Sequence, residues 1–163
     1  MTAPAHVFGG AAFYYLKKIE TRYWQLNMFL YFAMGVVSHF FLDAIRHQEY
    51  TLTWDYLVPL VTTETLLSIS LVLFVHRGDS LLTKIYIFSS MFGGIVPDAV
   101  WVMDRVFHLD WAIINFMGKI HYFFHFGNRY EFVFPPISLV NQTAFGLIAV
   151  YFMYRIRNLP PAT

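Results

Sequence analysis

Cysteine is absent from the 163-residue sequence, and charged residues are scarce, at 13% of the chain. Without cysteine there is no disulfide framework, no CxxC redox pair and no thiolate zinc site, so any metal ion has to bind histidine and carboxylate side chains. Soluble domains usually carry about 25% charged residues, and the low content here argues against an ordinary soluble globule. The formal net charge is +1 and there is no basic tract, so we expect no nucleic-acid partner.

Hydrophobic residues make up 58% of the chain, and they are gathered in stretches long enough to cross a bilayer. A spanning helix needs about 20 mainly apolar residues. Four stretches meet this length: residues 24–45, 54–75, 85–104 and 133–154. The apolar stretch 3–16 would reach only about 21 Å against a bilayer core of about 30 Å, so we expect a short, tilted or partly inserted helix there. Residues 110–126 mix polar and apolar positions as an interfacial or re-entrant helix does. We therefore predict an all-α polytopic membrane helix bundle, a single integral membrane domain over residues 1–163, with four long spans, a short N-terminal helix and an interfacial helix.

Lysine and arginine indicate how this bundle is oriented, because basic loops tend to stay in the cytoplasm. With four spans, one face carries Lys17, Lys18, Arg22, Arg77, Lys84, Arg155 and Arg157, and the other carries Arg46, Arg105, Lys119 and Arg129. The first face is therefore predicted to be cytoplasmic.

Two Phe-Gly-Gly phrases occur in this apolar background, at residues 8–10 and 92–94. Small residues let helices approach one another closely in lipid. We interpret both phrases as helix-packing positions.

Ionisable side chains inside an apolar span cost about 2.5 to 3.5 kcal/mol each on insertion scales, so they normally face the bundle interior and mark a site. His39, Asp43 and His47 follow one another at intervals of four residues. This spacing places all three on one face of a helix and suits metal ligation. The alternative is a His–Asp hydrogen bond that only holds the helix to a neighbour.

Asp98 lies in a second span that should run in the same direction, at a depth similar to that of His39. Pro97 before it removes a backbone donor, which predicts a helix break with carbonyl groups that need a partner. A structural hydrogen bond is the alternative role for Asp98. His121 and His125, again four residues apart, lie in the connection on the same side, where they are either metal ligands or interfacial residues. His6 joins this side only if the first short segment crosses the membrane.

Three further ionisable residues are placed differently. Glu64 lies near the middle of its span, where it could pair with a cation, support a ligand histidine or act as a general base. His76 and His108 lie near predicted span ends, and we expect both to be solvated boundary residues.

The motifs HVFGG, SHFFLD and GGIVPD, together with the pair His121 and His125, resemble the YdjM-like membrane-bound metal-dependent hydrolases, and more distantly zinc-dependent phospholipase C. The resemblance implies a bacterial inner-membrane protein. It also implies a set of metal ligands: His6, His39, Asp43, Asp98, His121 and His125.

Three functions are compatible with these residues. The first is a hydrolase in which one or two divalent ions, zinc or manganese, activate water against an ester or phosphoester of a lipid or lipid-linked substrate, with Asp98 or Glu64 as general base. The second is a haem-binding electron-transfer protein with axial histidines, although the aspartates suit a hard divalent ion better. The third is a non-catalytic transporter or assembly subunit, with an ion path at Pro97 and Glu64.

Overall fold

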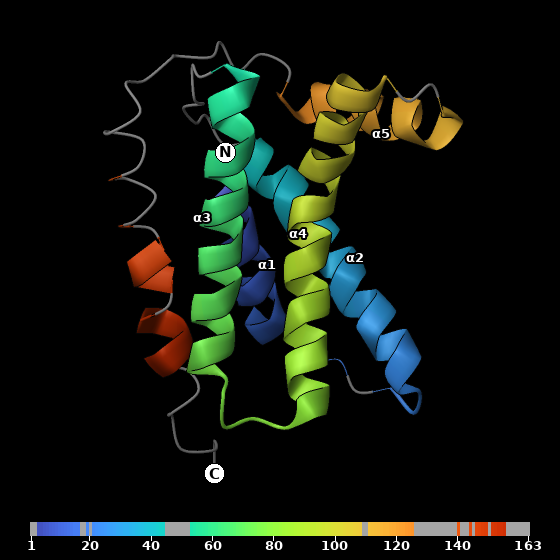
Figure 1. The fold of residues 1–163 in the computed structure, drawn as a ribbon. Coiled ribbons are helices and arrows are strands. Elements are labelled where there is room, and N and C mark those ends of the chain that lie inside the picture. Colours follow the sequence, from blue (N-terminus) through green and yellow to red (C-terminus); the bar gives the residue numbers. More distant parts are fainter. Residues whose placement is uncertain are drawn as a thin grey trace.

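The structure is a computed structural model, and every regular element in the part of the chain that it describes is a helix (Figure 1). It describes residues 3–16, 19, 21–44, 53–108, 111–125, 140, 144, 146–149 and 151–155. The helices are α1 (Ala3–Leu16), α2 (Trp24–Asp43), α3 (Trp54–Val75), α4 (Leu81–Phe107) and α5 (Ala112–His125). The predicted all-α class is confirmed, and a helix occupies each of the first three predicted spans as well as both shorter segments.

Three of these helices, α2, α3 and α4, are long and apolar enough to cross a membrane. α1 has 14 residues and is too short to do so unaided, as predicted from its length. The fourth predicted span, residues 133–154, falls only partly within the described residues. Those described between 140 and 155 are helical, but a continuous fourth span is not confirmed.

The helices run alternately up and down the bundle, so their ends form two groups. The turn of residues 76–80 joins the end of α3 to the start of α4, where Ser80 Oγ accepts a hydrogen bond from the Thr83 amide at 3.1 Å. Ser89 Oγ donates to the Met28 carbonyl at 2.8 Å, which brings the first half of α4 beside the first half of α2. We call the end of the bundle that contains the turn of residues 76–80 the basic end, because Arg77 and Lys84 lie there. α5 lies across the opposite end of the bundle, at a steep angle to α4 (Figure 1).

Glycines bring the backbones of α1, α2 and α4 into direct contact. A Cβ atom at Gly10 would lie 2.6 Å from the Ser90 carbonyl oxygen, and one at Gly94 would lie 2.5 Å from the His6 carbonyl oxygen. Added Cβ atoms at Gly35 and Gly93 would likewise collide with the backbone of the facing helix. The packing interpretation of the Phe-Gly-Gly phrases therefore agrees with the structure, since both contribute glycines to these contacts.

The apolar core lies around α1, which is enclosed by the other helices. Its buried members come from α1, α3, α4 and the C-terminal segment: Val7, Phe8, Ala11, Val72, Ile87, Met91 and Met153. Gly146 also packs on the ring of Phe8. The described C-terminal residues thus cover the side of α1 that the long helices leave open.

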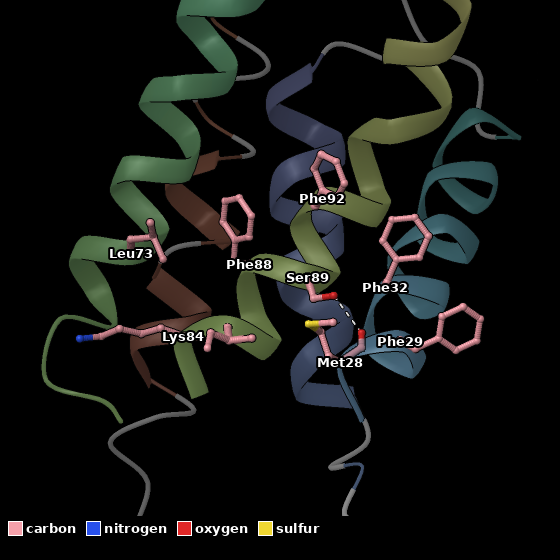
Figure 2. Close-up of a pocket in the computed structure, with 9 residues that line it drawn as sticks. Met28, Phe29, Phe32, Leu73, Lys84, Phe88, Ser89 and Phe92 are labelled. Atoms are coloured by element: carbon pink, nitrogen blue, oxygen red, sulfur yellow. Dashed lines mark hydrogen bonds between the residues drawn. The ribbon is translucent and has the colours of Figure 1, made fainter. Parts of the chain in front are cut away.

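An apolar groove of 570 Å³ runs along the outer face of α4, between α2 and α3 (Figure 2). Its lining includes the partly exposed rings of Phe29, Phe88 and Phe92, and the single charged residue Lys84, whose ammonium donates to the Arg77 carbonyl at 2.8 Å. Such a surface suits contact with lipid chains, with the cation at the headgroup level. No histidine or aspartate lines the groove among the described residues, so it is separate from the candidate site.

Pro97 does not break α4, contrary to the prediction from its sequence, because the helix continues through it from Leu81 to Phe107. Proline leaves the carbonyl of Gly93 without its helical donor. One residue further along, the Gly94 carbonyl accepts a hydrogen bond from His39 Nδ1 at 2.8 Å. Close packing against neighbouring helices and donors from them are what allow proline inside membrane helices.

Candidate metal centre

Five ionisable side chains from four helices meet at the end of the bundle opposite the basic end. They are His6 of α1, His39 and Asp43 of α2, Asp98 of α4 and His121 of α5. The side chains of the first three have no exposed surface, His121 is buried, and the Asp98 side chain is 33% exposed. We call these five residues the His–Asp cluster. Its only substantial opening among the described residues is at Asp98.

Asp43 lies at the centre of the cluster, in the last turn of α2. Its Oδ2 atom is 2.8 Å from Nε2 of His39, one helical turn earlier, and 3.8 Å from Nε2 of His121. Its Oδ1 atom is 3.3 Å from Nε2 of His6. The predicted i, i+4 pairing of His39 with Asp43 is therefore present, and α1 and α5 add two further imidazoles to it.

Asp98 faces the same three histidines from the other side. Its Oδ2 atom is 3.5 Å from Nε2 of His6, and its Oδ1 atom is 3.6 Å from Nε2 of His121 and 3.8 Å from Nε2 of His39. The similar depth predicted for Asp98 and His39 agrees with this arrangement. Two groups of three within the cluster have ligand atoms close enough to hold an ion: His6, His39 and Asp43, and His39, Asp98 and His121.

The contacts of His6 and of His39 Nε2 with the two aspartates are ion-pair contacts that do not meet hydrogen-bond geometry. Both ring nitrogens of His6 and Nε2 of His39 are buried and make no hydrogen bond in the part of the chain that the structure describes. Buried polar atoms without partners are costly, and native proteins avoid them. Donor atoms around a tetrahedral ion with bonds of about 2.1 Å are about 3.4 Å apart, which falls within the spacing seen here. The cluster could therefore hold a divalent cation.

Groups around the cluster orient its histidines. The Gly94 carbonyl accepts from Nδ1 of His39, which leaves the lone pair of Nε2 directed at the carboxylates. The indole of Trp101 stacks on His121, with ring centroids 6.1 Å apart, and Trp54 of α3 packs against Trp101 at 5.9 Å. His6 and His39 stack on each other with centroids 4.1 Å apart. A ligand histidine typically has an outer hydrogen-bond partner for its second nitrogen, as His39 has in the Gly94 carbonyl.

The sequence left open whether His6 lies on the same side as the other candidate ligands, and the structure places it among them. α1 runs antiparallel to α2, so its N-terminal turns lie beside the C-terminal turns of α2. His6 therefore belongs to the cluster, although α1 is shorter than a full membrane span.

Three other residues proposed from sequence are not placed in the cluster. His125 is the last residue of α5, and its side chain lies outside the described residues, as does the whole of His47. Glu64 is buried in the middle of α3, 8% exposed, and neither group of potential ligands among the described residues includes it. Its role as a general base stays a prediction.

The sequence interpretation missed two supporting residues and was wrong about one histidine. The two supporting residues are Gly94 and Trp101, and their spacing in the sequence could have indicated them. Gly94 lies three residues before Pro97, and Trp101 lies three residues after Asp98, on the same helix face. His76, expected to be solvated, is 1% exposed. It accepts a hydrogen bond from Tyr15 Oη at Nε2 (2.5 Å) and donates from Nδ1 to Asp79 (2.6 Å), so partners from α1 and the α3–α4 turn satisfy it. His108 is exposed at the end of α4, as expected.

Comparison with known proteins does not assign this chain to a family: no family model, no curated protein and no solved structure matches it. The similarity to YdjM-like hydrolases therefore remains a prediction based on short motifs. Function has to be inferred from the geometry of the His–Asp cluster.

Proposed function

We propose that this protein is a membrane-embedded, metal-dependent hydrolase that acts on an ester or phosphoester of a lipid or lipid-linked substrate. The observation that carries the proposal is the convergence of three imidazoles and two carboxylates from four helices, in which the ring nitrogens of His6 and Nε2 of His39 are buried and make no hydrogen bond to any described residue. Zinc is the metal that this ligand set suits best, and manganese is the alternative. The resemblance of the motifs supports placing the protein in a bacterial inner membrane.

A divalent ion in such a cluster lowers the pKa of water and polarises the substrate oxygen, which is the chemistry that ester hydrolysis needs at neutral pH. The side chains of the cluster would hold the ion and accept a proton from water. His39, held by the Gly94 carbonyl, keeps a fixed tautomer and orientation. Asp98 is the only cluster member with a substantially exposed side chain, so it is the carboxylate best placed to accept a proton from water at the opening.

The location of the cluster supports a substrate held at the membrane face. Asp43 is the last residue of α2, and α5, with apolar residues on one face, lies across this end of the bundle. Trp101 stacks on His121 and Trp54 packs against Trp101, and tryptophan is enriched at membrane interfaces. A lipid headgroup would therefore meet the cluster without leaving the bilayer surface.

The geometry disfavours haem. A haem iron binds imidazoles above and below a wide planar ring, but the His6 and His39 rings stack at 4.1 Å, with Asp43 and Asp98 against both. This packing leaves no room for a porphyrin between them.

The proposal is tested on the full-length protein purified in detergent, by elemental analysis and by hydrolysis of ester and phosphoester substrates. Wild type should contain zinc or manganese. His39→Ala and the milder Asp98→Asn should each reduce metal affinity by more than about tenfold and abolish metal-dependent hydrolysis. His108→Asn is the matched control, because it removes an exposed imidazole and asparagine tolerates the left-handed backbone (φ 51°) at this position.

Each other result has a clear meaning. Iron with a visible absorption band would identify a haem protein. A wild type without metal, or His39→Ala and Asp98→Asn variants that both retain the metal content of wild type, would remove the hydrolase proposal and favour a transporter or assembly subunit.

A further inference from the structure

We infer that the apolar groove on the outer face of α4 binds one acyl chain of an anionic phospholipid, with the lipid phosphate at Lys84. This site lies outside the proposed function. The lipid is a bound ligand that is not cleaved, because the groove starts at the basic end of the bundle and contains no member of the His–Asp cluster.

Aromatic rings from α2 and α4 form much of the groove. The rings of Phe88 and Phe92 are nearly parallel, with centroids 6.3 Å apart, and Phe32 packs against Phe92 at 6.1 Å (Figure 2). The one hydroxyl in the lining already has a partner, since Ser89 Oγ donates to the Met28 carbonyl at 2.8 Å. The groove therefore presents hydrocarbon along its length, which is the surface that an acyl chain needs.

The length of the groove matches one leaflet of a bilayer. Its lining residues on α4 run from Lys84 to Phe92, which corresponds to about 12 Å at the helical rise of ~1.5 Å per residue. The hydrocarbon of one leaflet is about 15 Å deep, half of a core of ~30 Å. A chain anchored at the membrane surface fills such a groove, whereas a partner helix that crosses the membrane would need one that follows the whole span.

The charge at one end of the groove selects the headgroup. The Lys84 ammonium donates to the Arg77 carbonyl at 2.8 Å, which leaves two of its three N–H groups for another acceptor. No carboxylate of the described residues forms an ion pair with Lys84, and Asp79 in the adjacent turn contacts His76 instead. Lys84 is also the fourth residue of α4, where the positive end of the helix dipole disfavours a cation. An anion at this position would balance both charges.

A second cation lies at the same end of the bundle. Arg77 is exposed in the α3–α4 turn, with its guanidinium 4.4 Å from the ring centroid of Phe74. Basic residues beside a membrane surface attract anionic lipids, and the cytoplasmic leaflet, to which the basic end is assigned, is the anionic one. A zwitterionic lipid is a weaker partner, because its own ammonium competes with Lys84 for the phosphate.

The test is native mass spectrometry of the protein in detergent, titrated with dioleoyl phosphatidylglycerol or dioleoyl phosphatidylcholine, which carry the same acyl chains. Wild type should bind one phosphatidylglycerol at least about fivefold more tightly than phosphatidylcholine, as expected for one cation beside an anionic headgroup. Lys84→Gln keeps an N–H group but removes the charge, so it should bind both lipids equally. Lys119→Gln, the same change at an exposed lysine of α5, is the matched control and should keep the preference. Glycerol 3-phosphate, which has no acyl chain, should not compete with phosphatidylglycerol.

A second pair of variants tests the groove itself. Phe88→Ala removes part of its lining and should weaken binding of both lipids by more than about threefold without changing the preference, because only apolar contact is lost. Phe123→Ala removes an exposed ring of α5 that does not line the groove, and it should bind both lipids as wild type does.

Equal affinities of wild type for the two lipids would overturn the inference, and this comparison decides even if a variant fails to fold. Equal losses of phosphatidylglycerol binding in Lys84→Gln and Lys119→Gln would indicate attraction to surface charge in general. Equal effects of Phe88→Ala and Phe123→Ala would show that lipid binding does not use the groove. A lipid-free dimer that Phe88→Ala disrupts would identify the groove as a contact between two copies of the chain. None of these results changes the metal content, so the proposed function is decided separately.

Discussion

His76 and His39 are both buried, yet their surroundings give them different roles. His76 has a donor and an acceptor at hydrogen-bond distance, Tyr15 and Asp79, and these three side chains tie the end of α1 to the α3–α4 turn. Among the described residues, His39 has a hydrogen-bond partner for Nδ1 but none for Nε2. Nε2 instead faces the carboxylates of Asp43 and Asp98. A satisfied histidine stabilises a fold, whereas an unsatisfied one beside carboxylates indicates a ligand site.

We therefore predict that Tyr15→Phe destabilises the protein by about 1 kcal/mol, because it removes a buried hydrogen bond, and leaves metal content unchanged. The measurement is the free energy of unfolding in detergent, followed by tryptophan fluorescence. Tyr56→Phe, at a tyrosine that is 71% exposed, is the control and should have no effect. Loss of metal in Tyr15→Phe would show that this hydrogen bond and the His–Asp cluster are coupled.

The sequence indicated several cluster members but not which of their alternative roles they take. The four-residue intervals from His39 to Asp43 and from His121 to His125 define helix faces, since they follow from helix geometry alone. They do not define which faces meet, because that depends on packing between helices far apart in the chain. The interval pattern also cannot show that His76 has partners, since Tyr15 is 61 residues away.

At the scale of the elements, glycines set how closely α1, α2 and α4 approach, and hence whether the candidate metal ligands on these helices meet. Gly94 faces the His6 backbone, and Gly35 and Gly93 face the backbone of the neighbouring helix. The same stretch of α4 also supplies the carbonyl that orients His39. A shift of α4 away from α2 would therefore separate the ligands as well as weaken the packing.

We predict that Gly93→Ala destabilises the protein by about 1–3 kcal/mol, because its methyl group would collide with the backbone of α2 at Phe32. It should also lower metal affinity, since the collision moves Asp98 relative to His39. Gly118→Ala in α5 is the matched control: no atom of the described residues lies within 4 Å of its added Cβ, and alanine favours a helix over glycine by about 0.5–1 kcal/mol. Equal unfolding free energies and metal affinities for the two variants would contradict this account of the packing.

Helix positions were predictable because apolar runs and their lengths are local properties of the sequence. α3 coincides with the predicted span at residues 54–75, and α2 with most of the predicted 24–45. α4 extends beyond the predicted 85–104 at both ends, because Ser80 caps its start and the residues around Pro97 find partners on α2. Tolerance of proline depends on those partners, which the local sequence does not show.

For the whole molecule, the cluster and the basic end lie on opposite sides of the bundle. Arg77 and Lys84 lie at one end, where α3 joins α4. The His–Asp cluster lies towards the other end, beside α5. Combined with the rule that basic loops stay in the cytoplasm, this arrangement predicts that the cluster opens to the non-cytoplasmic side.

The absence of native cysteine makes this orientation measurable with single labels. Gly78→Cys places a thiol in the exposed turn at the basic end, and Thr53→Cys places one at the exposed start of α3, at the cluster end. In intact cells, a membrane-impermeant maleimide should label Thr53→Cys, and it should label Gly78→Cys only after the membrane is permeabilised. The reverse pattern would invert the assigned topology.

His121 reaches the other ligands from α5, the last of the four contributing helices to be synthesised and one that packs mainly on α4. The His–Asp cluster therefore lacks one of its three imidazoles until α5 docks. Ion binding by the complete cluster would then be a late step in assembly of the protein. It would stabilise the docked position of α5 against the helices synthesised before it.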